Sequence, residues 1–189
     1  TQQTQLNVDA ASTITSNNAA KDGGGIYADG GELHLVSNTV SGNTTDGNGG
    51  GVYLGNNSVF VVAESLAGDT AISNNSATNG GGIYADGGEL SISSTIVTNN
   101  EAAGSGGGIY STQQTKIGFR ESSIKDNKAA KDGGGIYADG GELAFLSTIV
   151  TNNETAGSGG GIYITQQTQL NVDAASTITS NNAAKDGGG

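Results

Sequence analysis

Short alternations of apolar and polar residues recur along the chain. One type is Gly-Gly-Ile/Val-Tyr, as at residues 24–27, and another is a pair of apolar residues two positions apart, such as Leu33 and Leu35. Because successive side chains of a strand point to opposite faces, both members of such a pair lie on one face. The pattern therefore predicts short strands with one buried face. The predicted inward positions are Ile26, Ala28, Leu33, Leu35 and Val40, with their equivalents in the other repeats.

A third recurrent piece is an apolar residue followed three positions later by asparagine. Stacked asparagine amides hydrogen-bond from one layer to the next in other stacked β structures. The sequence therefore predicts an internal asparagine ladder. Its predicted members are Asn17, Asn43, Asn74, Asn99, Asn127, Asn152 and Asn181, which follow Ile14, Val40, Ala71, Ile96, Ile124, Ile149 and Ile178.

Glycine triplets divide the chain into these repeats. They end at Gly25, Gly51, Gly82, Gly108, Gly135, Gly161 and Gly189, so one repeat has 26 to 31 residues. Such variation suits a coil whose turns absorb insertions, and the glycine, threonine and asparagine content disfavours helix. We therefore predict an all-β fold, a right-handed single-stranded parallel β-helix of about seven rungs, with three short strands in each rung.

A longer repeat contains the shorter one. Residues 165–189 are identical to residues 1–25, an offset of 164 residues. This identity predicts a tandem array in which residues 1–164 form one unit of six rungs and residues 165–189 begin the next identical unit. The chain is then an excerpt of a longer array.

The order of these motifs resembles a known family. Apolar-x-x-Asn, a short polar loop and Gly-Gly-x-Ile-Tyr are similar to the repeats of chlamydial-type polymorphic outer-membrane proteins, which use Phe-x-x-Asn and Gly-Gly-Ala-Ile/Leu/Val. The resemblance covers essentially the whole chain, with Ile or Val in place of Phe and Gly in place of Ala. It implies a secreted β-helix of a bacterial surface protein with an adhesive or surface role.

Composition narrows the classes of partner. The chain has no cysteine, which excludes a disulfide framework and a thiolate metal site. Its net charge of −11 argues against nucleic acid as a partner, and no stretch reaches the length of a transmembrane segment. The expected partner is the chain itself, head to tail or along the shaft, with glycans as an alternative.

One tyrosine occurs at the same position of six repeats. If Ile26 points inward, Tyr27 points outward, and rungs about 4.8 Å apart bring the rings into an external stack. Such a stack stabilises a scaffold, and it is also a candidate docking strip for a glycan. The strip consists of Tyr27, Tyr53, Tyr84, Tyr110, Tyr137 and Tyr163.

A hydroxyl row precedes the third strand of each rung and offers a second candidate surface. The expected outward row is Thr13, Thr39, Thr70, Thr95, Ser123, Thr148 and Thr177. The expected second column is Thr15, Ser41, Ile72, Val97, Lys125, Val150 and Thr179. Because this second column mixes hydroxyl and aliphatic residues, a regular two-column threonine face is absent, and ice binding ranks below glycan binding.

Acidic residues recur on every second rung. Asp29 and Glu32, Asp86 and Glu89, and Asp139 and Glu142 are candidates for weak Ca²⁺ sites, through carboxylates and backbone carbonyls. The nonapeptide signature of calcium-binding β-rolls is missing, and Lys116 aligns with Glu89 and Glu142. A solvated surface is the favoured interpretation, with no other cofactor expected.

Catalytic patterns are missing from the sequence. The lone His34 and the lone Arg120 lie several rungs apart, and no Ser/His/Asp set or metal-ligand spacing occurs. We therefore predict a non-enzymatic structural protein, an extracellular or cell-surface fibre or shaft of prokaryotic origin. The alternative is an adhesin that binds a glycan, or less favourably ice, through the tyrosine or threonine ladder.

Overall fold

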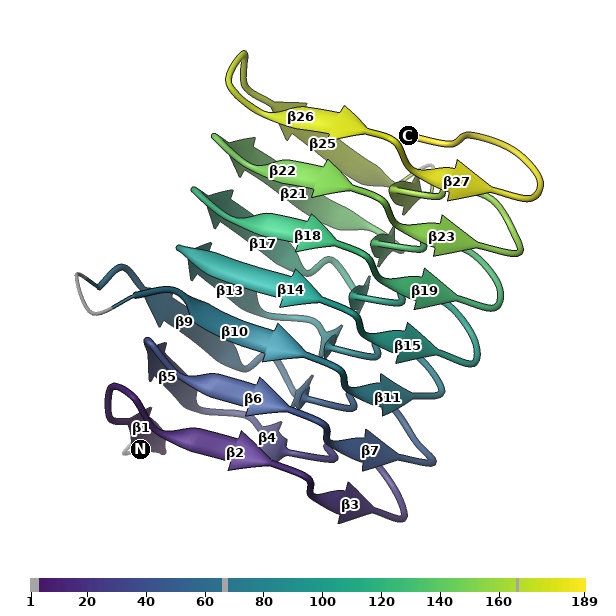
Figure 1. Cartoon of the computed structure of the whole chain (residues 1–189). Coiled ribbons are helices and arrows are strands. Elements are labelled where there is room, and N and C mark those ends of the chain that lie inside the picture. The colour runs from purple at the N-terminus through teal and green to yellow at the C-terminus, as the bar shows by residue number, and fades with distance from the viewer. Residues whose placement is uncertain (1–3, 66–67, 166) are drawn as a thin grey trace.

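A computed structural model describes residues 4–65, 68–165 and 167–189. Its strands coil into rungs that stack from the N-terminus to the C-terminus (Figure 1). Every strand pairs in parallel with its equivalents in the neighbouring rungs, so the coil is a right-handed parallel β-helix of about seven turns. The predicted fold class is confirmed.

Four sheets run along the molecule. Sheet 1 consists of β1 (Gln5–Val8), β5 (Glu32–Val36), β9 (Val59–Ala63), β13 (Glu89–Ser93), β17 (Lys116–Arg120), β21 (Gly141–Leu146) and β25 (Thr168–Val172). Sheet 2 consists of β2 (Thr13–Thr15), β6 (Thr39–Ser41), β10 (Thr70–Ser73), β14 (Thr95–Thr98), β18 (Ser123–Lys125), β22 (Ile149–Thr151) and β26 (Thr177–Thr179). Sheet 3 consists of β3 (Asn18–Ala19), β7 (Thr44–Thr45), β11 (Ser76–Ala77), β15 (Glu101–Ala102), β19 (Lys128–Ala129), β23 (Glu154–Thr155) and β27 (Asn182–Ala183). Sheet 4 consists of β4 (Ile26–Asp29), β8 (Val52–Gly55), β12 (Ile83–Asp86), β16 (Ile109–Thr112), β20 (Ile136–Ala138) and β24 (Ile162–Ile164).

The prediction of three strands per rung is wrong, because sheet 3 adds a fourth. Each of its strands has two residues, with a small side chain such as Ala102 or Ala129 pointing inward. Two residues are too few for an apolar alternation to appear in the sequence, so the strand reads as part of the turn after the asparagine.

The core is a thin column of aliphatic side chains. Ile26, Leu33, Leu35 and Val40 are buried, while Ala28 is partly buried against them. Inside the column Phe119 stacks on Phe145 of the next rung, with ring centroids 5.0 Å apart. Side chains at equivalent positions therefore pack in rows along the axis. In this way a chain with only 33% hydrophobic residues forms a continuous core.

Sheet 2 has a different register from the prediction in three rungs. Ile72, Val97 and Val150 were expected on the surface, but all three are buried in the core. In the same rungs Thr70, Thr95 and Thr148 are buried rather than outward. These rungs carry two apolar residues and two asparagines in succession, so the sequence permits two registers one residue apart, and that shift exchanges the two faces of a strand.

The glycine triplets have two structural roles. Gly106 has φ +67°, a conformation that side chains disfavour. Gly108 has no such φ, yet a Cβ at this position would lie 2.8 Å from the carbonyl oxygen of Gly135 and 3.0 Å from Asn127 Nδ2. The first glycine therefore turns the chain, and the last allows adjacent rungs to approach.

Candidate functional site

The asparagine ladder runs through the interior beside sheet 2. From Asn43 on, each amide Oδ1 accepts from both the backbone N–H and Nδ2 of the asparagine one rung before it, at 2.9 to 3.0 Å. From the second rung on, each Nδ2 also donates to a backbone carbonyl of the rung before. The ladder consists of Asn17, Asn43, Asn75, Asn100, Asn127, Asn153 and Asn181. The amides are thus bonded to one another, and the ladder holds rungs together.

Three predicted ladder residues are not in the ladder. Asn74, Asn99 and Asn152 lie one residue earlier, on the surface, with φ between +53° and +56°. Asparagine tolerates this left-handed conformation better than most residues. The three-residue spacing itself holds once the inward apolar residue of each rung is used, as in Val97 and Asn100.

The six tyrosines of sheet 4 form one continuous external stack. Neighbouring ring centroids lie 4.7 to 5.3 Å apart, with interplanar angles of 1° to 12°. Tyr27 is 56% exposed and the other five are partly buried. Burial, with a smaller effect of the Asp86 carboxylate, raises the pKa of Tyr84 to about 12, and burial likewise raises that of Tyr137 to about 12.

This stacking limits what the tyrosine strip can bind. Each of the four internal rings has a neighbour on both faces, so a sugar ring has no aromatic face to stack on there. Only ring edges and phenol hydroxyls point to solvent along the strip. The geometry therefore suits rung-to-rung stabilisation better than stacking against a pyranose ring.

The recurrent turn acids are exposed or partly buried, and the Asp86 Oδ1 atom is buried with no hydrogen-bond partner in the described structure. Asp29 accepts from Asn56 Nδ2 at 2.5 Å, and Glu142 accepts from Asn171 at 3.0 Å. In sheet 1 Lys116 stands in register between Glu89 and Glu142. Among the described residues no group of three or more His, Cys, Asp or Glu side chains is placed to hold a metal ion. The Ca²⁺ sites at these residues stay a prediction.

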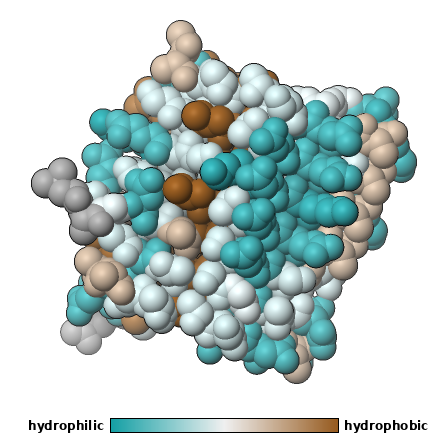
Figure 2. All heavy atoms as spheres, viewed as in Figure 1, coloured by the Kyte–Doolittle hydropathy of each residue, from teal (hydrophilic) through white to brown (hydrophobic). Residues whose placement is uncertain are grey.

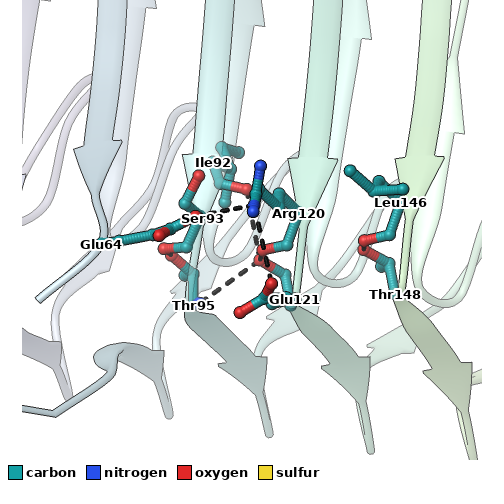
Figure 3. Close-up of polar contacts among 9 residues, drawn as sticks. Glu64, Ile92, Ser93, Thr95, Arg120, Glu121, Leu146 and Thr148 are labelled. Carbon is teal, nitrogen blue, oxygen red and sulfur yellow. Dashed lines mark hydrogen bonds and ion pairs between the residues drawn. The ribbon is translucent and has the colours of Figure 1, made fainter. Parts of the chain in front are cut away.

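A charged cluster marks the one long insertion, after β9. Arg120 Nε lies 2.7 Å from Glu64 Oε1 and 3.6 Å from Glu121 Oε1, with the Arg120 and Glu64 side chains about half exposed (Figure 3). Of this insertion Leu66 and Ala67 lie outside the described residues. An exposed ion pair contributes little to stability. His34 pairs instead with Glu32, at 3.4 Å, so the histidine and the arginine are not brought together.

The sequence interpretation missed a column of buried hydroxyls at the corner between sheets 1 and 2. Ser122 Oγ accepts from the Thr95 amide and donates to the Arg120 carbonyl two residues before it. Thr95 and Thr148 donate in the same way to Ser93 and Leu146 (Figure 3). The signal is a Ser or Thr two residues before the inward apolar residue of sheet 2, as in Thr95 and Val97. The column satisfies backbone groups where the chain turns.

Comparison with known proteins agrees with this geometry. A model described as the right handed beta helix region matches residues 65–189. The chain belongs to the right-handed β-helix family. A second model, the Chlamydia polymorphic membrane protein repeat, matches residues 11–29, which confirms the resemblance found in the sequence. No curated protein and no solved structure matches the chain.

The matched families indicate a coarse role. Polymorphic membrane protein repeats suggest a bacterial surface protein associated with the outer membrane or cell surface, and such families are typically non-catalytic. Within the described residues no helix is long and apolar enough to span a membrane.

Proposed function

We propose that this chain is a segment of a rigid, non-catalytic shaft that stands on the outside of a bacterial cell. The observation that supports it is the continuity of the sheets. Sheets 1, 2 and 3 each pass through seven rungs in a single parallel register. A solenoid of this kind grows in one dimension, because each rung contacts only its neighbours.

Three longitudinal ladders stiffen the proposed shaft. The asparagine ladder lies inside, the tyrosine stack lies outside, and the buried hydroxyls line one corner. The asparagine ladder and the tyrosine stack link each rung they reach to the next by a side-chain contact, in addition to the backbone bonds of the sheets. The buried hydroxyls do so between some rungs, as where the Thr95 amide donates to Ser122. Bending the shaft would separate contacts on several sides at once, so the arrangement favours mechanical over catalytic use.

The other candidate is an adhesin that binds a glycan along the tyrosine strip. Because the ring faces cover one another, such binding has to use the phenol hydroxyls and the neighbouring carboxylates, such as Asp29 and Asp86. We therefore rank the shaft above the glycan-binding strip.

A glycan array separates the two functions. The native chain and a Tyr84→Ser/Tyr110→Ser variant are applied to the same array, with Ser91→Ala on the solvent face of sheet 1 as the matched control. The shaft function predicts no glycan signal that depends on the two tyrosines. A signal present in the native chain and in Ser91→Ala but lost in the tyrosine variant would establish the adhesin instead.

A further inference from the structure

One rung sequence occurs twice in the structure, in two different surroundings. Rung 1 comprises β1 to β4 and rung 7 comprises β25 to β27, and residues 165–189 are identical to residues 1–25. Rung 7 lies on rung 6, which comprises β21 to β24, whereas in the described structure no rung lies against the side of rung 1 that faces away from rung 2. We call this side the lower face of rung 1. The surface that fits it is already present in the structure, as the side of rung 6 on which rung 7 lies.

Rung 7 binds rung 6 through three strand pairs and through the asparagine ladder. Leu170 lies in register with Leu143, one above the other in the core. Asn181 Oδ1 accepts from the backbone N–H and from Nδ2 of Asn153, both at 3.0 Å, and Asn181 Nδ2 donates to the Val150 carbonyl. A rung of this sequence therefore has a defined seat on rung 6.

The equivalent groups at the lower face of rung 1 are open. Leu6 is 50% exposed and Tyr27 is 56% exposed. Asn17 donates to Asn43, but its Oδ1 accepts no hydrogen bond in the described structure. A hollow of about 560 Å³ opens beside these residues, with Leu6 and Ile26 in its lining. The lower face thus presents the apolar side chains and the amide acceptor that rung 7 places against rung 6.

We propose that copies of this chain join head to tail by exchange of the terminal rung. Residues 165–189 of one copy leave rung 6, and rung 1 of a second copy takes their place. Exchange of an identical element is a low-cost route to association, and a head-to-tail contact of this kind builds an open filament. The inference deepens the proposed shaft function, because it names the partner that lengthens the shaft.

The exchange restores one set of contacts and adds another. Because the two sequences are identical, rung 1 of the second copy remakes the strand pairs and ladder bonds that rung 7 gives up. Sheet 4 has six strands where the other sheets have seven, so rung 7 leaves the edge of β24 uncovered. Strand β4 of the second copy covers this edge and brings together the Tyr163 and Tyr27 rings, each of which has one stacked neighbour before the exchange. The released segment regains conformational entropy, whereas rung 1 is already ordered by rung 2.

Two other contacts between copies fit less well. Rung 1 placed on rung 7 without exchange leaves a gap of one strand in sheet 4, with Tyr163 and Tyr27 two rungs apart, about 9.6 Å. Figure 2 shows the flank that carries sheets 2 and 3, which is mostly pale and teal with small separate brown spots. The open lower face of rung 1 is a more continuous apolar surface than this flank, so end contact is favoured over lateral contact.

A cross-link between copies tests the exchange. In joined copies Gln5 takes the place of Gln169, which lies in register with Glu142, so the thiols of a Glu142→Cys/Gln5→Cys variant lie on strands about 4.8 Å apart. Within one copy the two positions lie five rungs apart, about 24 Å. A short bifunctional thiol reagent should therefore give covalent multimers, since the chain has no other cysteine. Glu89→Cys/Gln5→Cys is the matched control and should stay monomeric, because Glu89 lies on an internal rung that is not exchanged.

Two variants at equivalent asparagines distinguish exchange from simple stacking. Asn181→Ala removes three side-chain hydrogen bonds of rung 7, so in the Glu142→Cys/Gln5→Cys chain it should lower the concentration needed for half-maximal cross-linking by about tenfold or more. Asn17→Ala removes the same bonds from the incoming rung and should raise that concentration. Simple stacking of rung 1 on rung 7 predicts weaker association in both variants, because it uses both asparagines.

Sedimentation of the native chain provides a second measurement that needs no cysteine. Its apparent mass should rise with concentration, and circular dichroism verifies that each variant is folded. A native chain that stays monomeric at all concentrations would overturn the proposal. So would a control that cross-links as well as Glu142→Cys/Gln5→Cys, or a shift in the same direction for Asn181→Ala and Asn17→Ala. None of these results bears on the shaft function, which rests on the continuity of the sheets within one chain.

Discussion

Replacement of Asn100 by alanine perturbs the asparagine ladder at its centre. The Asn100 side chain is 1% exposed and takes part in four hydrogen bonds. Its Oδ1 accepts from the backbone N–H and Nδ2 of Asn75, and its Nδ2 donates to the Ile72 carbonyl and to Asn127 Oδ1, all at 2.9 to 3.0 Å. Alanine removes all four and leaves their partners buried.

The magnitude follows from these four bonds. Each contributes about 1 kcal/mol net, so we expect Asn100→Ala to lower the free energy of unfolding by about 4 kcal/mol. Urea unfolding followed by circular dichroism measures this loss. Hydrogen exchange adds a local readout, since the Asn75 amide donates to the deleted Oδ1 and should lose its protection in the variant.

The adjacent residue provides the control. Asn99 is exposed, has φ +53° and makes no side-chain hydrogen bond in the described structure, so Asn99→Gly should change stability by less than about 0.5 kcal/mol. Glycine accepts this φ without strain, which alanine does not. If Asn99→Gly proves as destabilising as Asn100→Ala, the assignment of the ladder is refuted.

Three further perturbations have defined outcomes. Gly108→Ala should destabilise the fold by more than about 2 kcal/mol, because its Cβ meets backbone of the next rung. Gly118→Ala, whose Cβ has nothing within 4 Å, should be neutral or slightly stabilising in the same urea assay. Lys116→Glu places three glutamates in register on sheet 1 and should lower the free energy of unfolding by up to about 1 kcal/mol, because the like charges repel one another. Added salt should restore this stability, and a loss that does not depend on salt concentration would contradict the electrostatic cause. Tyr84 and Tyr137 keep their protons to about pH 12 in the fold but to pH 10.0 when unfolded, so the free energy of unfolding is unaffected below pH 10.0 and falls between there and about pH 12. Phenolate absorbance during an alkaline titration checks this, and two tyrosines titrating near 10 in the folded chain would contradict it.

The parts of the fold that repeat in every rung could be predicted from the sequence. Leu33 and Leu35 alternate with polar neighbours, which leaves one choice of inward face, and both are buried. The tyrosine follows a buried aliphatic residue in all six repeats, which places it outside. Where one pattern recurs with one register, sequence spacing and geometry agree.

Doubled residues made the remaining positions ambiguous. Ile96-Val97 followed by Asn99-Asn100 satisfies the apolar-x-x-Asn spacing in two ways, and only packing against neighbouring rungs selects Val97 and Asn100 for the interior. The same ambiguity led to the assignment of Ile72, Val97 and Val150 to an outward column, although all three are buried. The division into a unit of residues 1–164 and its successor stays a prediction.

Solution scattering tests the shaft most directly. Polypeptides of one, two and three 164-residue units are compared, since six rungs about 4.8 Å apart advance the axis by about 29 Å per unit. The account predicts that the longest dimension grows by this amount for each unit while the radius of gyration of the cross-section stays constant. A longest dimension that stays nearly constant while the cross-section widens would contradict a continuous β-helical shaft.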